Sequence, residues 1–120
     1  MFTISGNGII QLNRGDSVSM PLFINKGTNM RPIRYKISEN PSTKVYFGVM
    51  EPNQPFENAL IRQTFSSESK INSNGDLIIE LASYETENIL PGKYYYQVKV
   101  LFEDGNVSTV IPKTLFYIVD

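Results

Sequence analysis

The sequence has no cysteine, no histidine and no tryptophan among its 120 residues. Without cysteine and histidine, the chain cannot form disulfide bonds, thiol nucleophiles, imidazole bases or zinc sites with Cys and His ligands. A chain of this length needs no disulfide or bound metal to stabilise its fold, because it buries about two-thirds of the surface that its unfolded form exposes. We therefore expect one domain, residues 1–120, with an ordinary hydrophobic core, no cofactor and no metal.

Two further absences restrict the partners. The 11 basic and 12 acidic side chains give a formal net charge of −1, and they are interspersed, so we predict no nucleic-acid partner. No apolar run approaches the roughly 20 residues that span a bilayer, so we predict no membrane partner. The opening segment Met1–Gly6 lacks the positive and apolar regions of a signal peptide, so we expect the protein to begin as a soluble cytoplasmic chain.

The most regular pattern in the chain is an alternation from Tyr94 to Phe102. Its even positions are Tyr, Tyr, Val, Val and Phe, and a period of two predicts a strand with one buried and one exposed face. Pro91-Gly92 places a turn before this strand, and Asp104-Gly105 favours a tight reversal after it. Thr109 to Val119, rich in β-branched and aromatic residues, then returns as the antiparallel partner.

Six other short segments show strand patterns separated by turn signals. They are Gly8–Leu12, Val18–Ile24, Pro32–Ser38, Lys44–Val49, Ala59–Ser66 and Leu77–Leu81. We predict a loop at Lys26–Asn29 and a single helical turn within Ser83–Ile89 that crosses between two sheets. Seven or eight short strands at this spacing predict an all-β fold, and the final hairpin resembles the end of an immunoglobulin-like antiparallel β-sandwich.

Several short motifs share their order and spacing with one group of proteins. They are Gly15-Asp16, Tyr35 with Ile37, Thr43–Val49, Gly75–Leu81, Thr86, Leu90–Val98, and Thr114 with Phe116. On these motifs the chain resembles the immunoglobulin-like N-terminal domain of baseplate upper proteins from phages of Gram-positive bacteria, and related phage structural proteins. The resemblance implies a virion component of the baseplate, tail or head, a decoration or a fibre anchor. It also implies other virion structural proteins as partners and a homo-oligomer or repeated subunit in a symmetric assembly.

Arg14-Gly15-Asp16 has the sequence of an integrin-recognition tripeptide. That function would need a protruding turn from which Arg14 and Asp16 reach opposite charges on a receptor. We favour a structural interpretation, in which Gly15 adopts a positive φ and Asp16 caps the turn, because Gly-Asp is a common turn dipeptide.

Three consecutive tyrosines, Tyr94 to Tyr96, offer an aromatic platform for a carbohydrate. The alternation instead turns Tyr94 and Tyr96 inward, with one hydroxyl bonded back to the backbone as in a tyrosine corner. Only Tyr95 is expected on the outer face, where it contributes with Leu101 to a subunit contact.

Acidic residues gather loosely in the second half of the chain. They are Asp76, Glu80, Glu85, Glu87, Glu103 and Asp104. A carboxylate pair can act in acid–base catalysis or bind a hard cation if the fold brings two of them together. The regular spacing of a calcium loop is missing, so we interpret these residues as solvated charges and expect neither catalytic residues nor an enzyme.

Several large apolar residues fall on the exposed phase of their strands. A monomer seldom exposes many such side chains together, whereas a subunit with neighbours must do so. The alternative is that irregular strand ends or a covering loop hide them. We predict an interface with the candidate residues Phe23, Tyr46, Ile78, Tyr95, Leu101, Leu115 and Tyr117.

The predicted function is therefore that of a non-enzymatic virion subunit, which acts through strand faces and loops. The loops expected to make contacts are Asn25–Arg31, Glu51–Asn58 and Ser83–Ile89. An alternative is a receptor- or carbohydrate-binding module that uses Tyr46, Tyr95 and loop residues as a stacking surface. A hydrolase with Asp76 and Glu80 as its carboxylate pair is a third hypothesis, which we disfavour.

Overall fold

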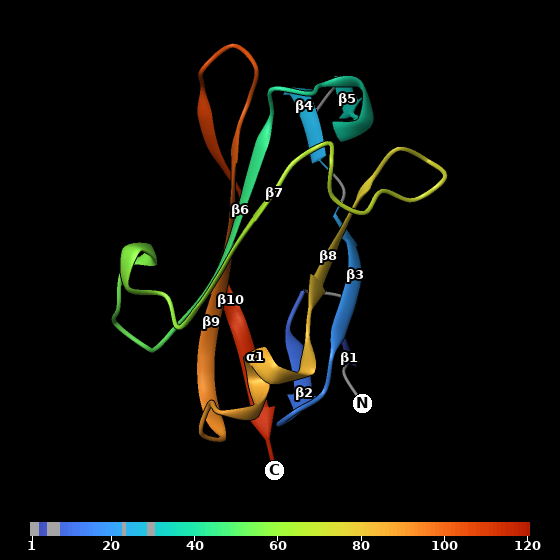
Figure 1. The fold of residues 1–120 in the computed structure, drawn as a ribbon. Coiled ribbons are helices and arrows are strands. Elements are labelled where there is room, and N and C mark those ends of the chain that lie inside the picture. The colour runs from blue at the N-terminus through green and yellow to red at the C-terminus, as the bar shows by residue number, and fades with distance from the viewer. Residues whose placement is uncertain (1–2, 5–7, 23, 29–30) are drawn as a thin grey trace.

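The computed structural model describes residues 3–4, 8–22, 24–28 and 31–120, which form strands, one short α-helix and two single-turn 3₁₀ helices (Figure 1). The strands are β1 (Thr3–Ile4), β2 (Ile10–Asn13), β3 (Val18–Leu22), β4 (Ile24–Thr28), β5 (Arg31–Tyr35), β6 (Lys44–Met50), β7 (Ile61–Phe65), β8 (Leu77–Leu81), β9 (Gly92–Leu101) and β10 (Val107–Val119). The helices are η1 (Ile37–Glu39), η2 (Phe56–Asn58) and α1 (Ser83–Glu87). In this described part of the chain, no helix has the length and apolar character to cross a bilayer.

The strands form an immunoglobulin-like β-sandwich, as predicted. The larger sheet has the order β1-β2-β10-β9-β6-β7, and its strands are antiparallel except where β2 runs parallel to β10. The order β10-β9-β6-β7 is that of strands G, F, C and C′ in an immunoglobulin fold, and the antiparallel pair β3-β8 takes the places of B and E. β7 is an edge strand of the larger sheet.

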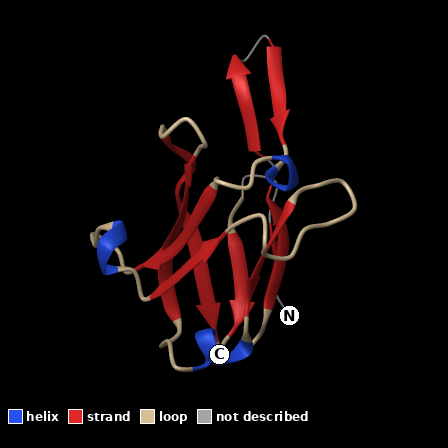
Figure 2. Ribbon diagram, turned by 45° about the horizontal axis from the view of Figure 1, so that its top comes forward, coloured by secondary structure: helices blue, strands red, loops and turns tan. Residues whose placement is uncertain are grey.

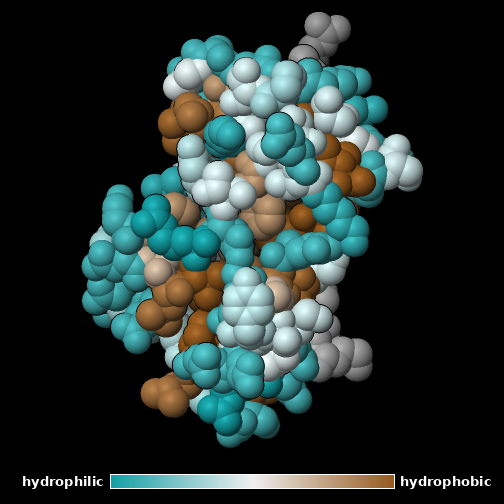
Figure 3. Space-filling view, viewed as in Figure 1, coloured by the Kyte–Doolittle hydropathy of each residue, from teal (hydrophilic) through white to brown (hydrophobic). Residues whose placement is uncertain are grey.

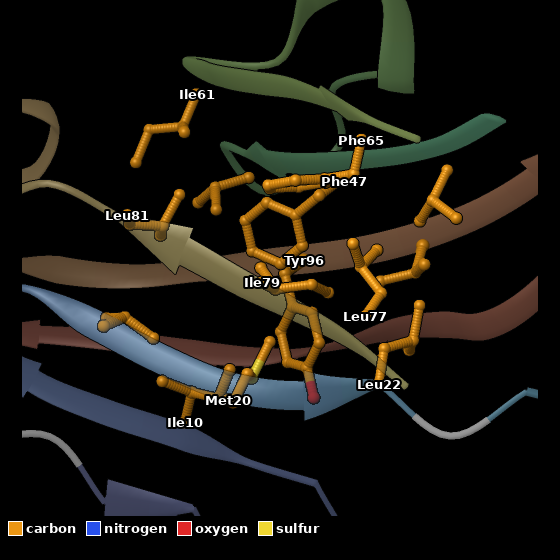
Figure 4. Packing of buried hydrophobic residues seen from close by; sticks show 14 of the residues in the cluster. Ile10, Met20, Leu22, Phe47, Ile61, Phe65, Leu77, Ile79, Leu81 and Tyr96 are labelled. Atoms are coloured by element: carbon orange, nitrogen blue, oxygen red, sulfur yellow. The ribbon is translucent and has the colours of Figure 1, made fainter. Parts of the chain in front are cut away.

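The core lies between the β3-β8 pair and the larger sheet. Figure 4 shows side chains from both sheets interdigitating, and the labelled residues include Met20, Leu22, Phe47, Phe65, Leu77, Ile79 and Tyr96. The predicted alternation along β9 is confirmed, because the even positions from Tyr94 to Val100 and the following Phe102 are buried. The odd positions Tyr95, Gln97, Lys99 and Leu101 are half-buried on the opposite face.

Two predictions about the first third of the chain are wrong. The predicted strand Val18–Ile24 belongs to two different sheets, with β3 paired to β8 and β4 paired to β5. The predicted loop Lys26–Asn29 is a strand as far as Thr28, because pairing with β5 overrides the turn preference of its residues. Consequently, the predicted contact loop Asn25–Arg31 lies mainly in β4 and β5, and its residues 29–30 are outside the described part.

The predicted strand Pro32–Ser38 also ends earlier than expected, at Tyr35. The η1 turn follows, in which the Asn40 backbone N–H donates to the Ile37 carbonyl at 3.1 Å. The Asn40 side-chain amide donates to the Lys36 carbonyl at 2.6 Å. Asparagine side chains that bond to nearby backbone offer the chain an alternative to a sheet ladder, which explains the early end.

The β4-β5 hairpin projects from one end of the sandwich (Figure 2). Its register places Ile24 opposite Tyr35 at the base and Thr28 opposite Arg31 at the far end. The base is anchored in the core, since Ile24 is buried and the Tyr35 ring meets the Phe102 ring edge-on with centroids 4.9 Å apart. Tyr35 also shares a hydrogen bond of 2.6 Å with the hydroxyl of the buried Thr43.

Helix α1 carries the chain from the β3-β8 pair to the larger sheet, which confirms the predicted crossover. Its only buried residue is Thr86, whose hydroxyl donates to the Asp16 carbonyl at 2.9 Å and accepts the Gly15 backbone N–H at 3.1 Å. Gly15 has the predicted positive φ, 89°. One hydroxyl therefore ties α1 to the turn between β2 and β3.

Thr86→Val should lower the free energy of unfolding by about 2–3 kcal/mol, because the Gly15 N–H and the Asp16 carbonyl both lose a partner. Thr86→Ser keeps the hydroxyl and removes only a methyl group, so its loss should be about 1 kcal/mol. Urea denaturation followed by circular dichroism measures both. A serine variant less stable than the valine variant would contradict the role of the hydroxyl.

Candidate interaction surface

The outer face of the larger sheet carries an apolar patch where β9 and β10 pair. Leu115 lies opposite Tyr95, and Tyr117 lies two residues further along β10, opposite Lys93. The side chains of Tyr95, Leu115 and Tyr117 are half-buried. They point away from the core, because their neighbours Tyr94, Phe116 and Ile118 are the buried residues of these strands. We call Tyr95, Leu115 and Tyr117 the outer patch.

A loop covers the neighbouring part of the same face. Phe56 in η2 lies over Gly48 of β6, where a Cβ atom would meet the Phe56 ring at 2.7 Å. Lys99 and Arg62 contact the Phe56 ring at 4.9 and 6.0 Å from its centroid, an arrangement that allows cation–π attraction. Met50, opposite Tyr95 on this face, is fully buried although it lies outside the core cluster. Beside the loop, the residues of the outer patch remain partly exposed.

The other candidate interface residues are not part of the outer patch. Tyr46 lies opposite Lys99, and Leu101 lies opposite Lys44, towards the other end of the same face. Four residues along β6 separate Tyr46 from the row of Tyr95, about 13 Å of extended strand. Ile78 lies on the β3-β8 pair, opposite Pro21. Phe23 lies outside the described residues.

A second apolar surface lies at the lower left of Figure 3, between the loop after β6 and the segment between α1 and β9. It surrounds a hollow of about 200 Å³, lined by Glu51, Leu60, Asn88, Ile89, Leu90 and Tyr94. Leu60 is 48% exposed and Leu90 is 74% exposed, unusual values for leucine. Neither leucine lies in a strand with a readable alternation, so the sequence pattern does not predict their exposure.

Tyr94 forms the predicted tyrosine corner below this hollow. Its hydroxyl donates to the Leu90 carbonyl at 2.5 Å, which fixes the turn at Pro91-Gly92 before β9. Burial, together with the negative charge of Glu51, raises the pKa of Tyr94 above its ordinary value. Burial alone raises the pKa of Tyr96, whose hydroxyl donates to the Gly8 carbonyl.

Alkaline pH should destabilise the protein through these two tyrosines. Their ordinary pKa is 10.0, and the folded state keeps both protons to higher pH than the unfolded state does. The free energy of unfolding is therefore unaffected by them below about pH 10 and falls as the pH rises beyond it. Urea denaturation from pH 8 to pH 11 should show this fall, and Tyr94→Phe/Tyr96→Phe should show a smaller one. If the free energy of unfolding fell equally with pH in the two proteins, the role of these tyrosines would be contradicted.

The Arg14-Gly15-Asp16 turn is held by contacts within the chain. The Arg14 guanidinium pairs with the Asp120 carboxylate at 3.1 Å, and the Arg14 N–H donates to the Val119 carbonyl at 2.7 Å. The Asn13 N–H donates to the Asp16 carboxylate at 3.2 Å, the capping arrangement that was predicted. The Arg14 guanidinium and the Asp16 carboxylate, which a receptor would have to bind, are therefore both engaged within the chain.

The acidic residues are dispersed or paired. Asp76 is buried and Glu80 is exposed, and the four residue steps from one to the other correspond to about 13 Å of extended chain. The two carboxylates of a glycoside hydrolase lie at most about 9.5 Å apart, closer than the separation of Asp76 and Glu80 along the chain. Over the described ranges, no group of three or more acidic side chains is placed to hold a metal ion.

A wider groove of about 500 Å³ runs beside the ends of β3 and β8 and along α1. Its lining residues are Ser17, Val18, Ser19, Gln63, Lys70, Glu80, Leu81, Ala82, Tyr84 and Glu85. The charged groups in it already have partners: Lys70 pairs with Glu80 at 2.9 Å, and Glu85 accepts hydrogen bonds from Gln63 and the Ala82 N–H. Ser67 and Lys70 have Ser-x-x-Lys spacing, but the ion pair occupies the Lys70 ammonium.

Comparisons with protein-family models, with curated proteins and with solved structures found no match to the chain.

Proposed function

We propose that the chain is a non-enzymatic structural subunit of a phage virion that binds neighbouring subunits through the outer patch. The observation that supports this proposal is the group of Tyr95, Leu115 and Tyr117, which are partly exposed on the outer face of the larger sheet. Large apolar side chains on a flat sheet face suit a protein–protein contact, because aromatic anchors are enriched in the centres of interfaces.

The surroundings of the outer patch favour protein over carbohydrate as the partner. Lys93 is the nearest cation, 5.9 Å from the Tyr95 ring centroid, and Leu115 is the direct neighbour of Tyr95. A sugar site needs convergent hydrogen-bonding groups beside its aromatic ring, whereas the neighbour here is aliphatic. Tyr46, the second tyrosine of a stacking surface, lies four residues away along β6.

Leu115→Lys should prevent incorporation into particles, because a lysine in the centre of an apolar contact loses its hydration without a partner. A tagged chain is expressed in the host of the phage that encodes it, and particles are purified on a density gradient and probed by immunoblot. The unaltered chain should sediment with the particles, and Leu115→Lys should remain in the soluble fractions.

Val107→Lys is the matched control, because Val107 lies in the same strand, is 63% exposed and is outside the outer patch. It should sediment with the particles as the unaltered chain does. An unaltered chain found only in soluble fractions, together with saturable binding to a glycan array, would contradict the proposal in favour of a carbohydrate-binding module.

A further inference from the structure

Strand β7 leaves one edge of the larger sheet open. In the described part of the chain, β7 pairs with β6 and with no other strand (Figure 1). The unpaired edge of a strand presents backbone N–H and C=O groups to which a strand of another molecule can bond, and proteins normally protect such edges. We therefore asked which groups this edge presents and what protects it.

The backbone groups of Arg62 and Thr64 face the open edge. In an antiparallel pair, each residue directs both its N–H and its C=O either towards the partner strand or away from it, and the two arrangements alternate along the strand. The Val49 carbonyl of β6 accepts the Leu60 N–H at 2.7 Å, so Val49 and its register partner Ile61 face each other. Arg62 and Thr64, the first and third residues after Ile61, therefore face away from β6.

The position beside this edge is open. Among the described residues, no backbone hydrogen bond outside the β6 ladder involves Arg62 or Thr64, and both residues are exposed. The groove of about 500 Å³ reaches Gln63, so the inner side of the edge is open as well. Tyr84 lines the same groove and is 69% exposed, and aromatic side chains of this kind are enriched in protein interfaces.

Other strand edges of the molecule are protected in ways that β7 lacks. Pro21 in β3 has no N–H to donate to a further strand. The outer edge of β8 is partly covered, because the Ile78 N–H donates to the Lys70 carbonyl at 2.9 Å. β1, at the opposite edge of the larger sheet, has only two residues. β7 contains neither proline nor glycine, so its edge is the better template for another strand.

The charged groups around β7 do not obstruct its edge. The Arg62 guanidinium lies 6.0 Å from the centroid of the Phe56 ring, which lies over Gly48 of β6. Arg62 is therefore directed back across the outer face of the sheet. Glu85 of α1 accepts a hydrogen bond from the Gln63 side chain on the inner face, so this carboxylate also has a partner within the chain.

We infer that the β7 edges of two copies of this chain pair antiparallel about a two-fold axis at Gln63. Arg62 of one copy then lies opposite Thr64 of the other, and each of these pairs exchanges two backbone hydrogen bonds. Ile61 lies opposite Phe65 on the inner face. The contact is the same from both sides, so it closes at a dimer. The inference goes beyond the proposed function, because it assigns a second surface and names the partner.

The neighbouring registers are less favourable. An axis at Arg62 would place two arginines directly opposite each other, which destabilises a sheet. An axis at Thr64 would place Arg62 opposite Ser66, whose N–H and carbonyl are already bonded to Ser69, both at 3.0 Å. The axis at Gln63 is the one that uses the outward groups of both Arg62 and Thr64.

Proline at the open edge should break the dimer. Sedimentation equilibrium of the unaltered chain should show a mass that rises with concentration from 13.6 kDa towards twice that value. Thr64→Pro removes an outward N–H and leaves the ladder to β6 intact, so it should dissociate at least about tenfold more readily. Thr64→Val keeps the N–H and should dimerise like the unaltered chain. Circular dichroism checks that both variants are folded.

Charge at the same position tests the register without proline. Thr64→Arg places an arginine opposite Arg62 of the other copy, and Thr64→Glu places a carboxylate there. Each pair occurs twice in the dimer, so Thr64→Arg should weaken it about fivefold and Thr64→Glu should strengthen it about fivefold. Equal affinities for these two variants would contradict the register.

Cysteine substitution tests the position of the axis. The chain has no cysteine of its own, and Gln63→Cys places two thiols in a pair with Cα atoms about 4.5 Å apart. Oxidation with diamide should therefore give a disulfide-linked dimer on a non-reducing gel. Thr64→Cys is the matched control, because its two thiols lie diagonally across the pair, roughly 7–8 Å apart and too far for a disulfide.

Three results would overturn the inference. They are an unaltered chain that stays monomeric up to about 1 mM, a Thr64→Pro variant that dimerises as strongly as Thr64→Val, and cross-linking of Thr64→Cys in preference to Gln63→Cys. A monomeric chain whose Thr64→Pro variant fails to enter particles would overturn it in favour of a strand from another virion protein. A dimer that never enters particles would leave the inference standing and contradict the proposed function.

Discussion

The inner face of β9 is the contact on which the structure depends. β9 lies between β10 and β6 in the larger sheet, so its buried side chains occupy the middle of the sandwich. The Tyr96 ring lies between Phe47 of β6 and Phe116 of β10, with centroids 5.9 and 6.1 Å away. Aromatic pairs at such distances add stability beyond their burial, and each large side chain buried here contributes roughly 1.5–3 kcal/mol. Because the middle strand of the sheet provides these core contacts, the outer face and the ends of the sandwich are available for contacts with other molecules.

The outer face and the ends are organised in different ways. Phe56, with Lys99 and Arg62 beside its ring, covers the part of the outer face over Gly48, and the outer patch is partly exposed on the same face. The β4-β5 hairpin projects from one end of the sandwich, and the hollow lined by Leu60, Ile89 and Leu90 lies between the loop after β6 and the segment between α1 and β9. The molecule therefore has a partly exposed sheet face and a separate apolar hollow.

Much of the sandwich follows from the sequence, because the period of two along β3, β8 and β9 is a local signal that the burial reproduces. In β6 the alternation ends at Phe47, after which every residue is buried. The tyrosine corner and the α1 crossover were also readable from turn residues. The β4-β5 hairpin was not, because Lys26, Gly27 and Thr28 favour turns individually and become a strand only by pairing with β5. The position of Phe56 over Gly48 depends on a loop that folds back onto the sheet, which no periodicity records.

The most direct test of this account compares two adjacent residues of β9. Val98 is buried in the core, whereas Gln97 is half-buried on the outer face, opposite Gly48. Urea denaturation of Val98→Asp should show a loss of more than about 4 kcal/mol or no folded protein, because a carboxylate is buried without a partner. Gln97→Asp should lose about 1 kcal/mol or less, the range of strand propensities. Equal losses at the two positions, or a larger loss at Gln97, would contradict the account.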